Sequence, residues 1–317
     1  MLTRLEKIFA SQPLISFLLR KSKKVFLPGF KGLPLFDVIR FFHGQVKTIG
    51  ITERAAAISY NFIMSIPPSL LFLFSLIPHL PFISMASIQI QLHSLIYDIV
   101  PNRDYNVELI KFVNSFMEGK QVGLLSFGLL LTLFFASNAM MGLMRAFSKN
   151  YTGYETVKGL KRRWMSIKLT ILIFGLLLVY LFLLIMQGKM LELIVEDSGW
   201  REVISYGRWF LMIVLVFFAI AFIYKYAPGI HKSWRLFSPG TILATVLSLL
   251  SSFAFAIFVN NFGRYNALYG SIGTIMVVMA LIYINSLVLL IGFELNVSIN
   301  TLKDRQEKKE QTGVVVS

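Results

Sequence analysis

The sequence predicts an all-α membrane protein with six transmembrane helices, both termini in the cytoplasm, and amphipathic helices at the membrane surface. Of its 317 residues 56% are hydrophobic and only 15% are charged, whereas soluble domains average about 25% charged residues. The mean hydropathy is +0.69. The chain also contains six apolar stretches, each close to the roughly 20 residues that one crossing needs.

The first three predicted spans are free of Asp, Glu, Lys and Arg, and they cover residues 55–77, 122–144 and 169–186. The fourth charge-free run, 209–224, has only 16 residues, about 24 Å of helix against a hydrocarbon core of about 30 Å. Arg208 and Lys225 are therefore expected to extend toward the interfaces. The fifth and sixth spans lie within 236–263 and 265–293, because this length suits a hairpin of two helices.

The positive charge lies mainly on one side of these spans. The predicted topology places 24 of the 31 Lys and Arg residues on the side that holds both termini, which marks that side as cytoplasmic. The net charge of +15 then favours anionic lipid of the inner leaflet as a partner over nucleic acid. Three regions follow: a basic N-terminal segment 1–54, a membrane domain 55–296 and a polar cytoplasmic tail 297–317.

Surface helices are predicted outside the spans. In residues 33–47, LPLFDVIRFFHGQVK, apolar side chains recur at helical spacing while charges occupy the other side, which is typical of a helix lying on a membrane. Residues 85–99 and 105–116 are two further candidates on the outer side, separated by Pro101. Within the tail, residues 303–317, KDRQEKKEQTGVVVS, are expected to be disordered.

The residues required by soluble enzymes are missing from the sequence. There is no cysteine, so thiolate sites are excluded. None of the four histidines has a partner at metal-ligand spacing, and no nucleotide-binding or hydrolase motif is present. We therefore predict no enzyme activity and no catalytic, cofactor-binding or metal-binding residue.

Polar residues inside the spans are candidates for a passage. Asn61, Asn138 and Asn285 should lie roughly 9 to 12 Å in from the cytoplasmic edge, where they form either one polar layer or separate interhelical hydrogen bonds. Pro67 and Pro68 should kink or break the first span near its middle. Such breaks occur at transporter binding sites, and static packing causes them equally well.

Two further features have a structural and a functional interpretation. The link 260–273, NNFGRYNALYGSIG, suits a tight turn at the outer interface, or an outer gate with a site for an anionic group. Its candidate residues are Arg264, Tyr265, Asn266, Tyr269, Gly270 and Gly273. Arg145 and Glu294 end the second and sixth spans on the cytoplasmic side, so they either pair across the bundle or extend to the interface independently.

Three strings carry a resemblance to a known family: ERAAAISYNFIMSIPPSLLFLFSLIP, ASNAMMGLMRAFSKNYTGYE, and the block from PGTILATVLSLL to LIGFELN. With them, the chain resembles the YihY/BrkB family of bacterial inner-membrane proteins over roughly residues 53–296. The resemblance implies six spans and a multi-pass location in the inner membrane. The family formerly carried the label ribonuclease BN, and the lack of an acidic cluster argues against that activity here.

These features favour a transporter or exporter, and the sequence does not name its substrate. The alternative is a non-transporting scaffold in envelope integrity or assembly, and an RNA-processing enzyme comes third. The composition leaves the oligomeric state open, with a homo-oligomer among the possibilities.

Overall fold

The computed structural model describes residues 25–76, 122–148, 159–185, 198–228, 235–261 and 263–311, with a few single positions between them. Every regular element in this part is a helix: α3 (Leu35–Thr48), α4 (Ile51–Leu76), α7 (Val122–Phe147), α8 (Gly159–Ile185), α10 (Ser198–Tyr226), α11 (Pro239–Asn261) and α12 (Gly263–Gln311). All except α3 are long and apolar enough to span a membrane. The predicted all-α fold with six spans is confirmed. The predicted helices at 85–99 and 105–116 lie outside the described residues, apart from isolated positions.

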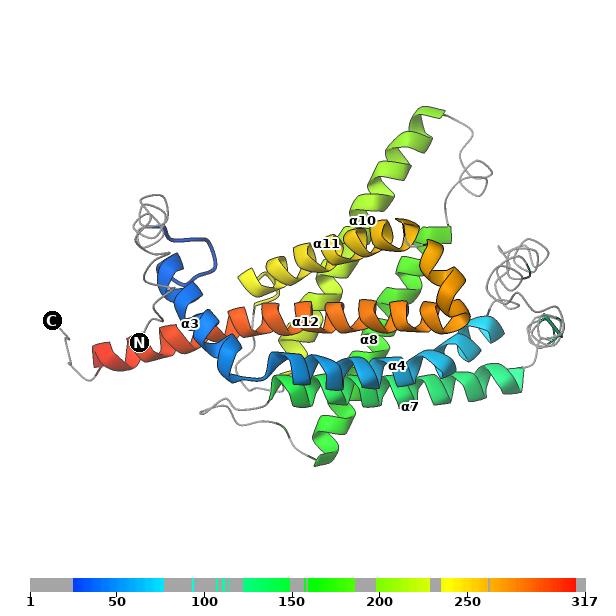
Figure 1. Cartoon of the computed structure of the whole chain (residues 1–317). Coiled ribbons are helices and arrows are strands. Elements are labelled where there is room, and N and C mark those ends of the chain that lie inside the picture. Colours follow the sequence, from blue (N-terminus) through cyan, green and yellow to red (C-terminus); the bar gives the residue numbers. More distant parts are fainter. Residues whose placement is uncertain are drawn as a thin grey trace.

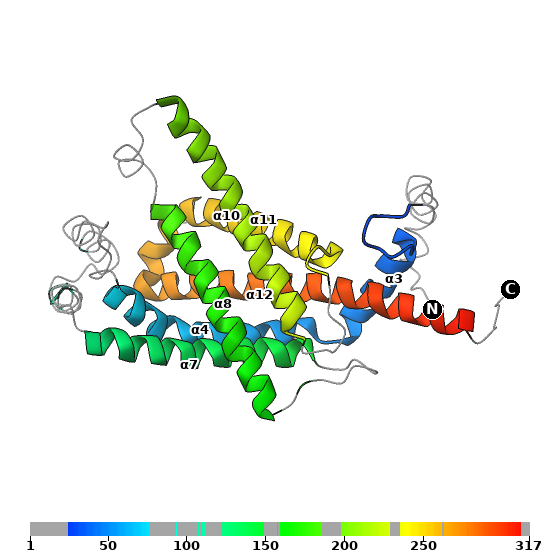
Figure 2. The ribbon, with the colours of Figure 1, turned by 180° about the vertical axis from the view of Figure 1, so that it is seen from behind.

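The six spanning helices form a closed ring in chain order, because each contacts the next and α12 returns to α4. Helices α4, α7, α11 and α12 run side by side, and α8 and α10 cross them obliquely on one face, behind them in Figure 1 and in front of them in Figure 2. Helix α3 and the C-terminal turns of α12 lie at one end of this bundle (Figure 1). We call this end, which is the predicted cytoplasmic one, the inner end.

The predicted limits of the fourth span and of the C-terminal tail change in the structure. The short fourth span belongs to the 29-residue helix α10, which begins ten residues before Arg208. The prediction of disorder from residue 303 onward is wrong as far as Gln311, because α12 continues to that residue as one helix of 49 residues. A helix that already exists in the membrane needs only propagation, and the Lys, Glu and Gln residues of the tail favour helix.

The helix predicted within 33–47 is present as α3, and its position on the membrane surface stays a prediction. Pro34 precedes it in an extended conformation, Asp37 lies in its first turn and Lys47 in its last, an order of charges that suits the helix dipole. Val38 is fully buried, in a small cluster with Phe30, Leu33 and Ile299. This cluster attaches α3 to the C-terminal part of α12.

The hydrophobic core lies mainly at the inner end. It is formed by the first turns of α4 and α11, the last turns of α7 and α10, the middle of α12, and Leu169 of α8. No described side chain is buried over 171–183 of α8, 246–258 of α11 or 276–285 of α12. Among their described side chains, these three helices are therefore packed tightly only toward the inner end.

Candidate functional site at the inner end of the bundle

A buried ion pair joins three helices at the inner end. Arg54, in the first turn of α4, donates from Nη1 to Oε1 of Glu294 on α12 at 2.7 Å. The two side chains are 5% and 0% exposed. The other terminal nitrogen of Arg54 donates to the carbonyl oxygen of Ala146, in the last turn of α7, where helical carbonyls lack partners. Arg54 therefore links α4 to both α12 and α7.

The prediction that Glu294 pairs with Arg145 is wrong, because its partner in the structure is Arg54. Arg145 is exposed, whereas the next two residues of α7, Ala146 and Phe147, are buried in the core. Sequence reasoning missed the partner of Glu294, because Arg54 is one of many basic residues that precede the first span. The available signal was its position, since Arg54 is the last charge before a long charge-free stretch.

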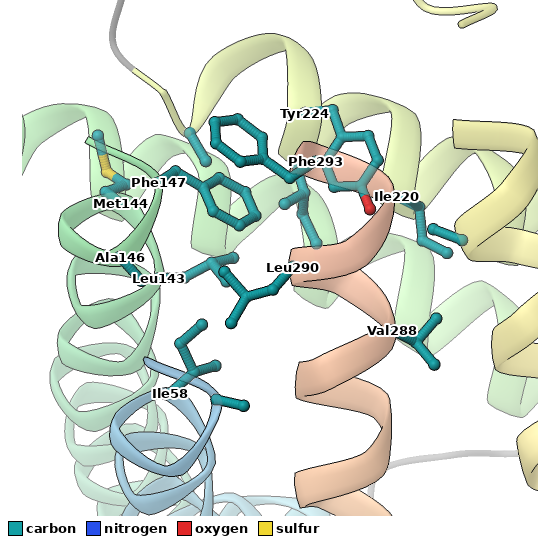
Figure 3. Close-up of a cluster of buried hydrophobic side chains, with 14 of the residues drawn as sticks. Ile58, Leu143, Met144, Ala146, Phe147, Ile220, Tyr224, Val288, Leu290 and Phe293 are labelled. Atoms are coloured by element: carbon teal, nitrogen blue, oxygen red, sulfur yellow. The ribbon is translucent and has the colours of Figure 1, made fainter. Parts of the chain in front are cut away.

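An aromatic cluster fills the bundle beside this ion pair (Figure 3). The rings of Phe147 on α7 and Phe293 on α12 are stacked, with centroids 4.0 Å apart and planes 4° apart. Tyr224 on α10 meets both rings edge-on, at 5.9 and 6.1 Å. Its hydroxyl donates to the carbonyl oxygen of Leu289 at 2.7 Å. Side chains from three helices thus pack together at the inner end, and sequence reasoning did not identify this cluster.

Helices α11 and α12 approach each other through glycine. A Cβ on Gly292 would lie 2.5 Å from the carbonyl oxygen of Gly240 and 2.5 Å from the Tyr224 hydroxyl, so only glycine fits there. One turn further along α12, Asn296 accepts a hydrogen bond from the backbone N–H of Gly240 at 2.9 Å and donates to Ser238 Oγ at 2.8 Å. Asn296 thereby satisfies a donor in the first turn of α11.

The three span asparagines are not brought together by direct contacts. Asn138 accepts a hydrogen bond from Arg163 on α8. Asn285 accepts one from Ser248 Oγ on α11 at 2.6 Å. Asn61 donates to the carbonyl oxygen of Ala57 in its own helix at 2.7 Å. Two of the three therefore link neighbouring helices, as the alternative interpretation predicted, and whether they line a passage stays a prediction.

Asn61 lies in a recess of about 330 Å³ between the inner ends of α4 and α7. A Cβ on Gly142 of α7 would lie only 2.8 Å from the Asn61 amide nitrogen. Arg145, Glu53 and Arg54 also line this recess. Arg145 therefore shares a surface recess with Asn61 instead of an ion pair with Glu294.

The proline pair bends α4 without ending it. The helix includes Pro67 and Pro68, and its ribbon changes direction in the last turns (Figure 1). Thr132 on α7 donates to the carbonyl oxygen of Pro68 at 2.7 Å. Beyond the prolines, a Cβ on Gly128 of α7 would lie 3.3 Å from Phe72 Cα. The kink thus accompanies close packing of α4 on α7.

The link between the last two spans is shorter than predicted. Helix α11 ends at Asn261 and α12 begins at Gly263, so a tight turn does not extend over 260–273. Arg264, Tyr265, Asn266, Tyr269, Gly270 and Gly273 occupy the first turns of α12. Their side chains are outside the described residues, and the proposed gate remains a prediction.

The inner-end site offers hydrogen-bonding and packing groups. Within the described ranges, no three His, Asp or Glu residues lie together in a way that could hold a metal ion. Glu294, the buried acid of the site, is engaged by Arg54. Its ion pair and stacked rings hold α12 against α4 and α7, and these helices could separate only if those contacts broke.

Comparisons with known proteins place the chain in a family. The model of the family described as "Virulence factor BrkB" matches residues 42–314. The ribonuclease-like protein YfkH of Bacillus subtilis is 28% identical over 258 residues, covering 79% of this chain and 90% of that protein. A UPF0761 membrane protein of Tolumonas auensis is 26% identical over 264 residues, covering 80% and 82%.

A UPF0761 membrane protein of Pseudoalteromonas atlantica is 22% identical over 284 residues, 87% of this chain and 90% of the relative. No solved structure matches the chain. The relatives and the six apolar helices agree on a multi-pass bacterial membrane protein. Because the family model covers most of the sequence, the chain belongs to the virulence factor BrkB family of membrane proteins.

Proposed function

We propose that the protein is a transporter whose described conformation is closed at the inner end. The observation that carries this proposal is the uneven packing of α8, α11 and α12, which have buried side chains toward the inner end and none over their described outer stretches. A static bundle gains most by packing along its whole length. A seal at one end is the arrangement that alternating access requires.

The inner-end seal consists of the Arg54–Glu294 pair and the stacked rings of Phe147 and Phe293. These contacts join α12 to α4 and α7, so they would separate together if α12 moved. The Arg54 Nε is buried and has no hydrogen-bond partner among the described residues. A partly satisfied buried network holds its helices less firmly than a complete one, which favours opening at this point.

Thiol accessibility tests the proposal, because the chain has no cysteine of its own. Asn285→Cys, beyond the seal, should react with a membrane-impermeant thiol reagent added from the outer side. Leu290→Cys, fully buried in the seal, should be protected. Adding Glu294→Gln should make position 290 reactive from the inner side, because the charge that holds Arg54 is lost.

Two controls sharpen this experiment. Glu53→Gln removes an exposed acid next to Arg54 and should leave position 290 protected. Leu250 is 56% exposed and lies about 200° around α11 from Ser248, which contacts α12. Leu250→Cys should therefore stay unreactive in lipid. Equal protection of positions 285 and 290, with and without Glu294→Gln, would contradict transport and favour the envelope scaffold.

An RNA-processing activity has less support. The name of the Bacillus subtilis relative is ribonuclease-like, but metal-dependent cleavage of phosphodiesters needs several ligands gathered on one or two ions. We expect purified protein to leave structured RNA intact with Mg²⁺ or Mn²⁺ present. Cleavage that disappears when one acidic residue of this chain is changed would overturn this expectation.

A further inference from the structure

A second hollow lies outside the ring of spanning helices. It has a volume of about 1100 Å³ and lies between α3, the segment that precedes it, and the C-terminal turns of α12. Three cations line it, Arg40 from α3 and Arg305 and Lys308 from α12, against one acid, Asp37. The hollow is therefore a basic pocket on the predicted cytoplasmic side.

The walls of this basic pocket are held in place by packing. Val38 and Ile299 are buried where α3 meets α12, and Leu302 packs against the same cluster. The guanidinium of Arg305 lies over the ring of Phe41, 5.1 Å from its centroid. This cation–π contact orders one pocket arginine before any ligand arrives.

The chain just before α3 is folded onto this wall. The backbone N–H of Leu35 donates to the carbonyl oxygen of Val25 at 3.0 Å. Gly29, Lys31 and Gly32 take positive φ angles of 88°, 53° and 76°. The resulting tight turns bring Phe26 to the rim of the pocket.

Exposed apolar side chains accompany the positive charge. Phe26 is 60% exposed, Leu27 is 41% exposed, and Ile39 on α3 is 51% exposed. An amphipathic helix with such residues beside its cations lies in the membrane interface. The inner leaflet is also rich in anionic lipid. The exposed apolar side chains and the positive charge therefore both favour a lipid with an anionic headgroup.

We propose that this basic pocket binds the headgroup of an anionic phospholipid from the inner leaflet. Arg40 and Arg305 contact the phosphate, since guanidinium groups match phosphate oxygens in a bidentate geometry. Phe26 supports the start of the acyl chains at the rim. A bound lipid would hold α3 against α12, whose middle part contributes Glu294 to the inner-end seal.

Native mass spectrometry of the full-length protein in detergent, titrated with dioleoylphosphatidylglycerol, measures this binding. Dioleoylphosphatidylcholine is the zwitterionic reference. The double variant Arg40→Gln, Arg305→Gln should bind phosphatidylglycerol roughly 30-fold more weakly, from the usual contribution of two surface arginines. Its melting temperature without added lipid should stay close to that of the unchanged protein, because Arg40 and Arg305 are outside the buried core.

The matched control is Lys47→Gln, Lys303→Gln, which removes the same charge from the same two helices but outside the pocket lining. It should keep phosphatidylglycerol binding within about twofold. Equal losses in both double variants would show general attraction to the leaflet and overturn the site. Displacement of the lipid by millimolar inorganic phosphate or glycerol phosphate would point to a soluble anion and also overturn it.

Discussion

At the scale of single residues, Arg54 connects three helices, because it lies on α4 and contacts Glu294 of α12 and Ala146 of α7. Two charges inside a helical bundle are tolerated when each satisfies the other, and removing one partner leaves a costly buried charge. Both side chains here are almost fully buried, and the arginine also serves a carbonyl at the end of α7. The pair therefore has the properties of a structural lock at the inner end.

The first prediction concerns this lock. Glu294→Gln should lower stability in detergent by about 3 to 5 kcal/mol, because it leaves the Arg54 guanidinium buried without its counter-charge. Replacing both residues, as in Arg54→Met with Glu294→Met, should recover part of the loss, because no buried charge remains. Thermal unfolding measures both effects. Strictly additive losses in the double variant would mean that the two residues do not interact.

At the scale of elements, α11 and α12 can approach each other closely because glycine, which has no side chain, occupies their crossing point. Small residues let membrane helices approach until their backbones touch. Gly240 and Gly292 face each other in this way, and Asn296 adds hydrogen bonds at the same crossing. Rotating or separating either helix would disturb all of these contacts.

The second prediction tests this crossing. Gly292→Ala should destabilise the protein by about 1 to 3 kcal/mol, because the new methyl group overlaps the Gly240 carbonyl and the Tyr224 hydroxyl. Gly175→Ala in α8 is the matched control, since nothing lies within 4 Å of its added methyl group. The control should be neutral or stabilising by up to about 1 kcal/mol. A melting temperature that is equal in the two variants would contradict the close crossing.

The whole molecule places α3 and the end of α12 at the same end of the ring (Figure 2). This agrees with an even number of spans between them, and the distribution of Lys and Arg predicts which side is cytoplasmic. In the third prediction, Glu155→Cys is protected from a membrane-impermeant thiol reagent in intact cells, and Asn266→Cys is labelled. After the cells are opened, both should react. Labelling of intact cells at 155 but not at 266 would reverse the predicted orientation.

The candidate site could be predicted from the sequence only in part. Glu294 was recognised because a carboxylate is costly at the end of an apolar span, whereas its partner Arg54 was missed. Tyr224 and Phe147 were also missed, because one aromatic residue in an apolar helix is indistinguishable from its neighbours. The kink at Pro67 and Pro68 followed from local chemistry, but its packing against Gly128 did not.

The sequence by itself determined the number of spans, their approximate limits and the helix at Leu35, because hydropathy and helical periodicity are local properties of the chain. Only the tertiary structure decided which arginine meets Glu294, which helices the asparagines join and how far α12 extends as a helix. These outcomes depend on the rotation of each helix about its axis and on where two helices cross. Successive residues are about 100° apart around a helix. Adjacent positions can therefore differ in environment, as Arg145 is exposed and Ala146 is buried.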